Sequence, residues 1–417
     1  MSAHCAFLRA PDAPKNAKAA NLIDVRESGA MRIVRQRGAT INWIIKASKL
    51  CNLRCRYCYE WNELANPARV SLDQWDRLLQ SIRWYHHRRA IEASSPVETV
   101  IIWHGGEPLL LPTEYISEVM RIQRRWLGHE IAEGAVRNIV QTNLYRVSDA
   151  HLDVLERENI AIGISMDVFG GVRVDAAGLE TETRVAANIE RLQDRGVPFG
   201  GIAVLAAHTK DRLRRVYDFF EGLGAPLRVL PLFDAPLNVP GASFHLSYQE
   251  MISALRDLFR YWLSRRRPIP VHPLVDYLDV VQARRTGSQT TPYDRERTGE
   301  WAIMVNTCGT LYQVPDAYDG TRALGNAFEQ PFSAIVQSRA YRDSLTRDWN
   351  LREQVCGPCE YRGACSTLPL FHSRRADWHG ERCPIAYDMH VALEDDLRRR
   401  RMGPHRTAAF QRRVCAA

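Results

Sequence analysis

Residues 41–59 read INWIIKASKLCNLRCRYCY, and the interpretation of the whole chain starts from them. Residues 41–45 are an apolar, β-rich run of the kind found in strands that are buried on both faces. Three cysteines follow with Cys-x₃-Cys-x₂-Cys spacing: Cys51, Cys55 and Cys58. Three thiolates on one loop can ligate three irons of a [4Fe–4S] cluster and leave the fourth iron open to another ligand. A zinc site is the alternative, but zinc would need a fourth Cys or His, and the loop supplies none.

Further apolar runs follow at residues 97–103, 139–142, 160–166, 199–205 and 227–232. Amphipathic segments separate them, and Ser71 is placed to cap the first expected helix. Six β-then-α units in succession predict an α/β fold with a parallel sheet and right-handed crossovers. We expect a partial (β/α)₆ barrel with its site at the carboxyl ends of the strands, and a doubly wound open sheet is the alternative.

The chain divides by composition into five parts. We expect an N-terminal extension at 1–40, the barrel at 41–235, a helical connector at 236–303, a cysteine-rich domain at 304–397 and a basic tail at 398–417. About forty residues before the first strand are too few for a separate leader-recognition domain of about 80 residues. The long helix expected near 247–265 lies in the connector, and another is expected near 386–400.

The charge distribution argues against nucleic-acid binding. Lysine and arginine number 56 against 48 acidic residues, a net charge of +8. The tail holds seven of the arginines and no acid, so the rest of the chain is nearly neutral. We expect the tail to be a solvated end. No apolar run approaches the roughly 18 residues of a membrane helix, and no signal-peptide core precedes the first strand. The expected location is the cytoplasm, with no membrane and no nucleic-acid partner.

A second cysteine group lies in the C-terminal third of the chain. Its spacing is Cys-x₂-Cys-x₅-Cys with one more cysteine downstream, and its members are Cys356, Cys359, Cys365 and Cys383. Four thiolates fully ligate either a zinc ion or a second [4Fe–4S] cluster, and spacing alone does not separate the two. A non-catalytic zinc-binding interaction protein is therefore one candidate reading of the chain.

The first cysteine group, with Tyr57 before its last cysteine, resembles the signature of radical S-adenosylmethionine (SAM) enzymes. The stretch WHGGEP at 103–108 resembles the family's Gly-Gly-Glu-Pro element, QTN at 141–143 its Thr-Asn turn, and SMD at 165–167 its Ser-x-Asp element. The resemblance implies a [4Fe–4S] cluster on Cys51, Cys55 and Cys58 with SAM at its open iron. It also implies these cofactor-binding residues: Tyr57, Gly105, Gly106, Glu107, Asn143, Ser165 and Arg184.

The second cysteine group, with GNA at 325–327 upstream, resembles the SPASM extension of that family, whose members hold auxiliary clusters. A full SPASM domain has further cysteines where this chain has Pro315 and Pro369. We therefore expect one auxiliary [4Fe–4S] cluster, on the four cysteines of the second group. Cys5, Cys308 and Cys415 are expected to be free thiols. Asp316 stands where sulfatase-maturing relatives carry a catalytic aspartate, and a turn residue is its alternative role.

The resemblance implies a peptide maturase. Residues 167–188 look most like the cyclophane-forming maturases, which join an aromatic ring carbon to a side-chain Cβ of a ribosomally made precursor peptide. We expect hydrogen abstraction at Cβ, ring attack and rearomatisation with Asp316 as the base. The expected partners are the precursor peptide and an electron donor such as flavodoxin or ferredoxin. The alternatives are a sulfatase-maturase-like enzyme and a radical SAM enzyme that dehydrogenates a small molecule.

Overall fold

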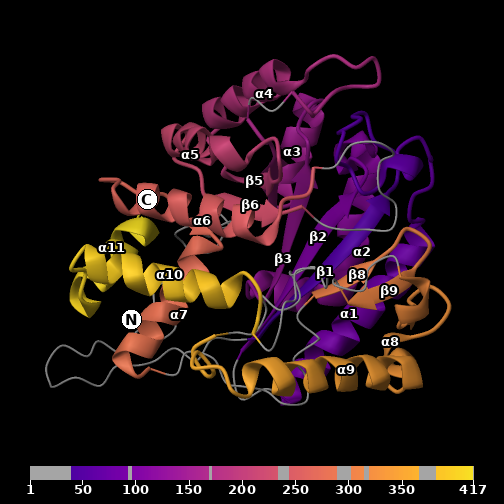
Figure 1. Ribbon diagram of the computed structural model, residues 1–417. Helices are drawn as coiled ribbons and strands as arrows, with labels where there is room; N and C mark the ends of the chain where they lie inside the picture. The colour runs from indigo at the N-terminus through magenta and orange to yellow at the C-terminus, as the bar shows by residue number, and fades with distance from the viewer. Residues whose placement is uncertain are drawn as a thin grey trace, which may run out of the picture.

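The computed structural model describes residues 39–92, 96–168, 171–232, 244–288, 302–313, 319–365 and 382–416, and Figure 1 shows how they are arranged. Within these ranges the strands form one sheet in the order β10-β9-β8-β1-β2-β3-β4-β5-β6-β7. Its edges are β10 and β7, so the sheet is an open, partial barrel rather than a closed one.

All six expected strands are present. They are β1 (Ala39–Ser48), β2 (Val97–Gly105), β3 (Val136–Thr142), β4 (Ile160–Ser165), β5 (Phe199–Leu205) and β6 (Leu227–Pro231). Each pairs in parallel with the next in sequence order. All their carboxyl ends therefore meet at one edge of the sheet, as the β/α pattern predicts.

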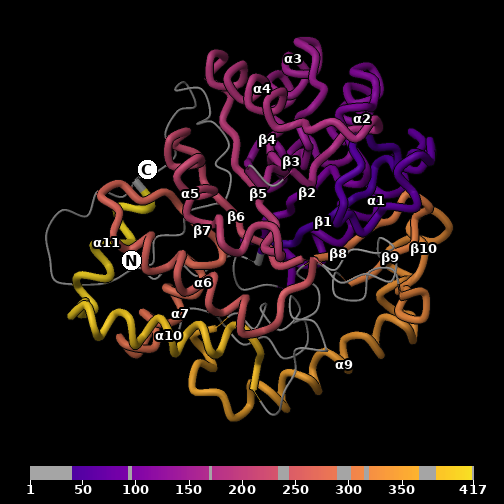
Figure 2. Tube along the Cα trace, turned by 45° about the horizontal axis from the view of Figure 1, so that its top comes forward, coloured from indigo at the N-terminus to yellow at the C-terminus, as the bar shows by residue number. Residues whose placement is uncertain are grey.

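The helices that connect these strands cover one face of the sheet. They are α1 (Leu72–Glu92), α2 (Thr113–Ala132), α3 (Asp149–Arg157), α4 (Glu182–Asp194) and α5 (Leu213–Gly222), and Figure 2 shows them outside the arch of strands. Ser71 caps α1 as expected, because its Oγ accepts from the Gln74 amide at 3.2 Å. Short 3₁₀ turns lie at η1 (Trp61–Glu63), η2 (Pro108–Leu110), η3 (Lys210–Arg212) and η5 (Gly320–Arg322).

Burial alternates along the strands. In β3 the residues that face the helices are buried, and those that face inward keep some exposure. On the helix side of β1, Trp43 makes edge contacts with Tyr85 of α1 at 6.0 Å and with Phe332 at 5.1 Å. The main apolar core thus lies between the sheet and its helices, and the inner face remains partly accessible near the carboxyl ends.

The region expected to be a connector joins both the sheet and the C-terminal helices. Helix α6 (Tyr248–Leu263) starts at a Ser247 capping box, and β7 (Val271–His272) pairs with β6. Helix α7 (Leu274–Thr286) then packs against the later helices α10 (Ala386–Arg399) and α11 (Pro404–Ala416). The expected helices near 247–265 and 386–400 are both present.

The C-terminal third of the chain extends the same sheet. Strand β8 (Ala302–Val305) pairs in parallel with β1. Strand β9 (Thr310–Gln313) pairs antiparallel with β8, and β10 (Gly325–Asn326) pairs antiparallel with β9. Helix α8 (Phe332–Ile335) brings Phe332 onto Trp43, and α9 (Arg339–Cys356) leads to the second cysteine group. The described residues contain no helix with the length and apolarity needed to cross a bilayer.

The basic tail is not a solvated end. Residues 404–416 form α11, in which Phe410 is 1% exposed and meets Trp262 edge-on at 4.8 Å. Gln411 donates to Asp279 of α7 at 2.6 Å. The expectation was wrong because it considered only the number of arginines. Thr407, Phe410 and Val414 recur at helical spacing and form a buried stripe on one side of α11.

Candidate active site

The first cysteine group forms a loop directly after β1. The Leu53 amide donates to Cys51 Sγ at 3.4 Å, and the Cys58 amide donates to the Cys55 carbonyl at 2.9 Å. Burial raises the pKa of Cys51 and of Cys58 to about 12 and also raises the pKa of Cys55. The three thiols are therefore neutral at pH 7 in the metal-free chain, and metal binding must displace their protons.

The Gly-Gly-Glu-Pro segment docks against this loop through its backbone. The Gly106 amide donates to the Ser48 carbonyl at 2.8 Å, and the Glu107 amide donates to the Leu50 carbonyl at 2.9 Å. A Cβ on Gly106 would lie 2.3 Å from the carbonyl oxygens of Lys49 and Leu50. Gly105 has φ +118° and would clash with Ser48 in the same way. Only glycine lets the two segments approach this closely.

Glu107 is a deeply buried carboxylate at this edge, with 1% exposure. It accepts from the Thr142 hydroxyl at 2.7 Å, the Leu109 amide at 2.9 Å and the Asn143 amide at 2.7 Å. Among the described residues it makes no ion pair, and burial raises its pKa to about 7. A buried carboxylate that lacks a cation, beside three thiols, fits a ligand that brings both a positive charge and a metal-binding group.

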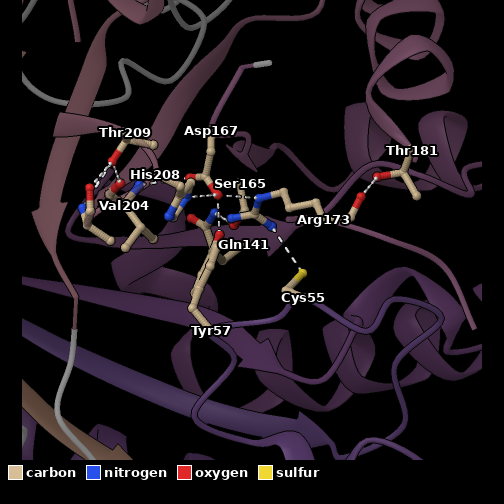
Figure 3. Close-up of polar contacts among 11 residues, drawn as sticks. Cys55, Tyr57, Gln141, Ser165, Asp167, Arg173, Thr181, Val204, His208 and Thr209 are labelled. Atoms are coloured by element: carbon tan, nitrogen blue, oxygen red, sulfur yellow. Dashed lines mark hydrogen bonds and ion pairs between the residues drawn. The ribbon is translucent and has the colours of Figure 1, made fainter. Parts of the chain in front are cut away.

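Two further expected residues come from the ends of β3 and β4. Asn143 Nδ2 donates to Asn52 Oδ1 at 2.9 Å and lies 3.8 Å from Cys51 Sγ. Ser165 Oγ accepts from Gln141 Nε2 at 2.6 Å (Figure 3). The structure thus brings strands β1 to β4 to one site, as their shared carboxyl edge requires.

Comparison with known proteins agrees with this geometry. Residues 45–220 match the model of the radical SAM superfamily. These residues are similar in sequence to that superfamily, and the described sheet has its α/β fold. The superfamily match implies SAM and a [4Fe–4S] cluster as cofactors.

Named relatives extend the likeness beyond the radical SAM domain. The serine-type anaerobic sulfatase-maturating enzyme of Klebsiella aerogenes is 29% identical over 326 residues, which cover 76% of each chain. The cysteine-type anaerobic sulfatase-maturating enzyme of Clostridium perfringens is 25% identical over 331 residues, covering 76% of this chain and 85% of the relative.

Two solved structures share the fold. Native anSMEcpe with bound AdoMet and Cp18Cys peptide superposes with a TM-score of 0.65 at 16% identity, over 90% of this chain and 99% of that one. Streptococcus suis SuiB bound to precursor peptide SuiA gives 0.55 at 13% identity, over 80% and 72% of the two chains.

The sequence analysis assigned no role to two charged residues at this site, Asp167 and Arg173, although Asp167 belongs to the SMD element. Asp167, at 0% exposure, accepts from the Tyr57 hydroxyl and from Arg173 Nε, the latter at 3.0 Å (Figure 3). The Tyr57 ring stacks on His208 with centroids 5.1 Å apart. The sequence offers one sign that Arg173 is buried, because it lies between the apolar residues Val172 and Val174. This pattern does not identify Asp167 as its partner.

A second missed pair lies on the inner face beside Cys58. Lys46 of β1, 3% exposed, forms an ion pair with Glu60. Burial lowers the pKa of Lys46 to about 8, although Glu60 opposes the shift. His104 lies opposite Lys46 on β2, accepts from the Gly105 amide at 2.8 Å, and has its pKa lowered to about 4 by burial. The sequence could have indicated this pair, because a lysine such as Lys46 within an apolar strand is rarely buried without a partner.

Two expected residues do not join the site in the described structure. Arg184 is exposed on α4, and its guanidinium lies 5.0 Å from the Tyr145 ring centroid. Asp316, Pro315 and Pro369 lie outside the described residues.

The second cysteine group gathers at the carboxyl end of α9. Burial raises the pKa of Cys383, and the proximity of Cys365, Cys356 and Cys359 raises it further. All four are free thiols, as is Cys308. Cys5 lies outside the described residues, and Cys415 is disulfide-bonded, so the expectation of a free thiol was wrong there. Over the described ranges, no three His, Cys, Asp or Glu side chains are arranged to hold a metal ion.

Proposed function

We propose that this protein is a radical SAM peptide maturase whose catalytic cluster is held by Cys51, Cys55 and Cys58. The observation that carries the proposal is the docking of Glu107, which is buried and forms no ion pair among the described residues, against the loop of three partly buried thiols. A cluster with one open iron supplies the missing metal, and the SAM ammonium supplies the missing cation. The donor set therefore fits both groups.

Several residues around the loop would each contact a different part of SAM. Gly105 and Gly106 let the backbone approach, Glu107 accepts from the ammonium, and Asn143 and Ser165 offer further polar contacts. Tyr57 contributes its ring near the cluster. When bound to the reduced cluster, SAM supplies a 5′-deoxyadenosyl radical that removes one hydrogen atom from the substrate. The partly accessible inner face of the sheet is where that substrate would lie.

A peptide is the substrate class that the comparisons favour. The named relatives are sulfatase-maturating enzymes, and the solved structures of similar fold hold a Cp18Cys peptide or the precursor peptide SuiA. Within this class we propose a cyclophane cross-link between an aromatic ring and a side-chain Cβ. Such a cross-link would require that the radical supplied by SAM remove one Cβ hydrogen, and that the ring lose one electron and one proton to regain aromaticity. Asp316 is the proposed proton acceptor.

We further propose one auxiliary [4Fe–4S] cluster on Cys356, Cys359, Cys365 and Cys383 as the acceptor of that electron. Iron analysis tests the count, with about eight irons per chain expected for two clusters. Replacing Cys356 and Cys383 by alanine should remove about half of the iron and leave deoxyadenosine formation intact. Flavodoxin or ferredoxin is the proposed electron donor to the catalytic cluster.

Sulfatase maturation is the second candidate, because the named relatives all carry that activity in their names. Both candidates begin with hydrogen abstraction at a side-chain Cβ. They differ in the product, which is a carbon–carbon bond in one and an aldehyde in the other.

The deciding experiment incubates the reconstituted enzyme with SAM, a reductant and two substrates. One is a precursor peptide encoded beside its gene, and the other is a sulfatase-derived peptide with a target serine or cysteine. Cross-linking removes the mass of two hydrogen atoms, resists aminooxy reagents and yields a linked fragment by tandem mass spectrometry. An aminooxy-reactive product from the sulfatase peptide would establish the second candidate instead. A Cys51→Ala variant that still makes deoxyadenosine would refute both.

A further inference from the structure

A short segment after β4 is hydrogen-bonded to the cysteine loop. We define this clasp segment as residues 171–175. The Arg54 amide donates to the Val174 carbonyl at 2.7 Å, and the Arg56 amide donates to the Val172 carbonyl at 2.9 Å. An antiparallel bridge joins Leu53 to Asp175. The hydrogen bonds lie on either side of Cys55, so this cysteine is held in a two-stranded arrangement rather than on a free loop.

Arg173, at the centre of the clasp segment, points into this arrangement (Figure 3). Its Nη1 lies 3.8 Å from Cys55 Sγ, and its guanidinium carbon lies 5.6 Å from the Tyr57 ring centroid. Arg173 is buried, with 8% of the residue exposed. One guanidinium therefore contacts a cysteine sulfur and the aromatic residue two positions later.

Asp167 holds that guanidinium in place. Burial alone would raise its pKa, but Arg173 and hydrogen bonds from His208 and Tyr57 keep the pKa of Asp167 well below its usual value. Asp167 also accepts from the Val204 amide at 2.9 Å, which ties it to β5. The Thr181 hydroxyl donates to the Arg173 carbonyl at 3.0 Å and fixes the backbone. The ion pair is thus anchored from both sides before any cofactor binds.

We propose that Arg173 is a positioning residue that donates a hydrogen bond to the Cys55 sulfur and so holds the cysteine loop in its cluster-binding form. The inference rests on the proposed ligand set of Cys51, Cys55 and Cys58. An N–H donor and a positive charge beside a ligating thiolate stabilise the cluster more in its reduced, more negative state. Arg173 therefore raises the reduction potential of the cluster and slows the loss of iron.

The test measures the SAM-free holoprotein, so that effects on SAM binding do not enter. The variants are Arg173→Met, Arg173→Lys and the double variant Asp167→Asn/Arg173→Met, which avoids leaving a buried charge unpaired. Arg195→Met is the control, because Arg195 also pairs with carboxylates but contacts Asp149, Asp153 and Glu156 rather than the cysteine loop. Circular dichroism establishes that each variant is folded.

Two readouts are independent of turnover: iron competition with a ferrous chelator and the midpoint potential followed by electron paramagnetic resonance. SAM is added after these measurements, and the electron paramagnetic resonance signal that then changes is assigned to the catalytic cluster. We expect iron binding at this site to weaken about 10- to 100-fold in Arg173→Met and in the double variant. The midpoint should shift to more negative values, with Arg173→Lys intermediate and Arg195→Met unchanged.

The inference would be overturned if Arg173→Met and the double variant, both folded, kept the iron retention and the midpoint potential of the wild-type protein. This holds even if their affinity for SAM falls. That outcome would assign Arg173 to SAM binding alone. A wild-type protein that retains no iron at the first cysteine group would instead overturn the proposed function, so the two failures are distinguishable.

Discussion

Glycines at two positions decide whether the Gly-Gly-Glu-Pro segment can reach the cysteine loop. At Gly106 an added methyl group would meet two backbone carbonyl oxygens at 2.3 Å, and a backbone cannot rotate away as a side chain can. The contact is therefore steric in origin and independent of any bound cofactor.

Replacing Gly106 by alanine should lower the free energy of unfolding by about 3 kcal/mol and reduce iron incorporation, because the two segments must separate. Thermal unfolding and iron analysis of the purified variant provide the measurement. Gly128→Ala is the matched control. Gly128 has nothing within 4 Å, and alanine favours the helix by about 1 kcal/mol. Equal stability and iron content in the two variants would contradict the steric account.

Glu107 gives the SAM-free, metal-free protein a pH-dependent stability. Its pKa is raised from 4.5 to about 7 in the folded state, so the native protein binds more protons than the unfolded chain between these values. Stability should therefore fall by about 3 kcal/mol as the pH rises from 4.5 to 7. In Glu107→Gln this component should be absent. Urea unfolding at a series of pH values compares the two, and parallel pH profiles would contradict the assignment.

At the scale of elements, α11 shows that a buried apolar stripe contributes more to the docking of a helix than exposed charges do. Its outer side carries exposed arginines, while Phe410 packs on Trp262 of α6 and Gln411 bonds to α7. Apolar burial and the disulfide of Cys415 hold the helix in place, because exposed charges contribute little to docking.

We expect Phe410→Ala to cost about 3–5 kcal/mol and to release α11 from α6 and α7. Urea unfolding measures the loss of stability, and protease cleavage between α10 and α11 reports the release. Arg406→Ala, on the exposed side of the same helix, should change stability by less than about 0.5 kcal/mol. A Phe410→Ala protein as stable as Arg406→Ala would show that α11 does not contribute to the core.

At the scale of the whole molecule, the barrel and the C-terminal region share a sheet. Four residues of β8 pair with β1, and Phe332 completes the aromatic packing around Trp43 and Tyr85. The strand that leads into the first cysteine loop, β1, is therefore supported by residues from the C-terminal third of the chain.

A chain shortened to residues 1–288 should fail to form a stable monomer. The β1 edge would expose unpaired backbone groups, and Trp43 would lose one of its aromatic neighbours. Size-exclusion chromatography and near-ultraviolet circular dichroism, beside the full-length protein, provide the measurement. A monomeric product with native-like aromatic signals would mean that the barrel folds without the C-terminal strands.

The amino-acid sequence by itself determined the local features of this protein. The six parallel strands, the Ser71 cap and the three-cysteine loop depend on residues close together in the chain, so their patterns are readable without coordinates. The contacts that complete the site are of another kind. Tyr57 and Asp167 are 110 residues apart, and Cys55 and Arg173 are 118 apart. Only the tertiary structure decided these pairs, and likewise the docking of α11 and the joining of β8 to β1. Each depends on which surfaces the folded sheet brings together, and residue spacing along the chain does not encode that geometry.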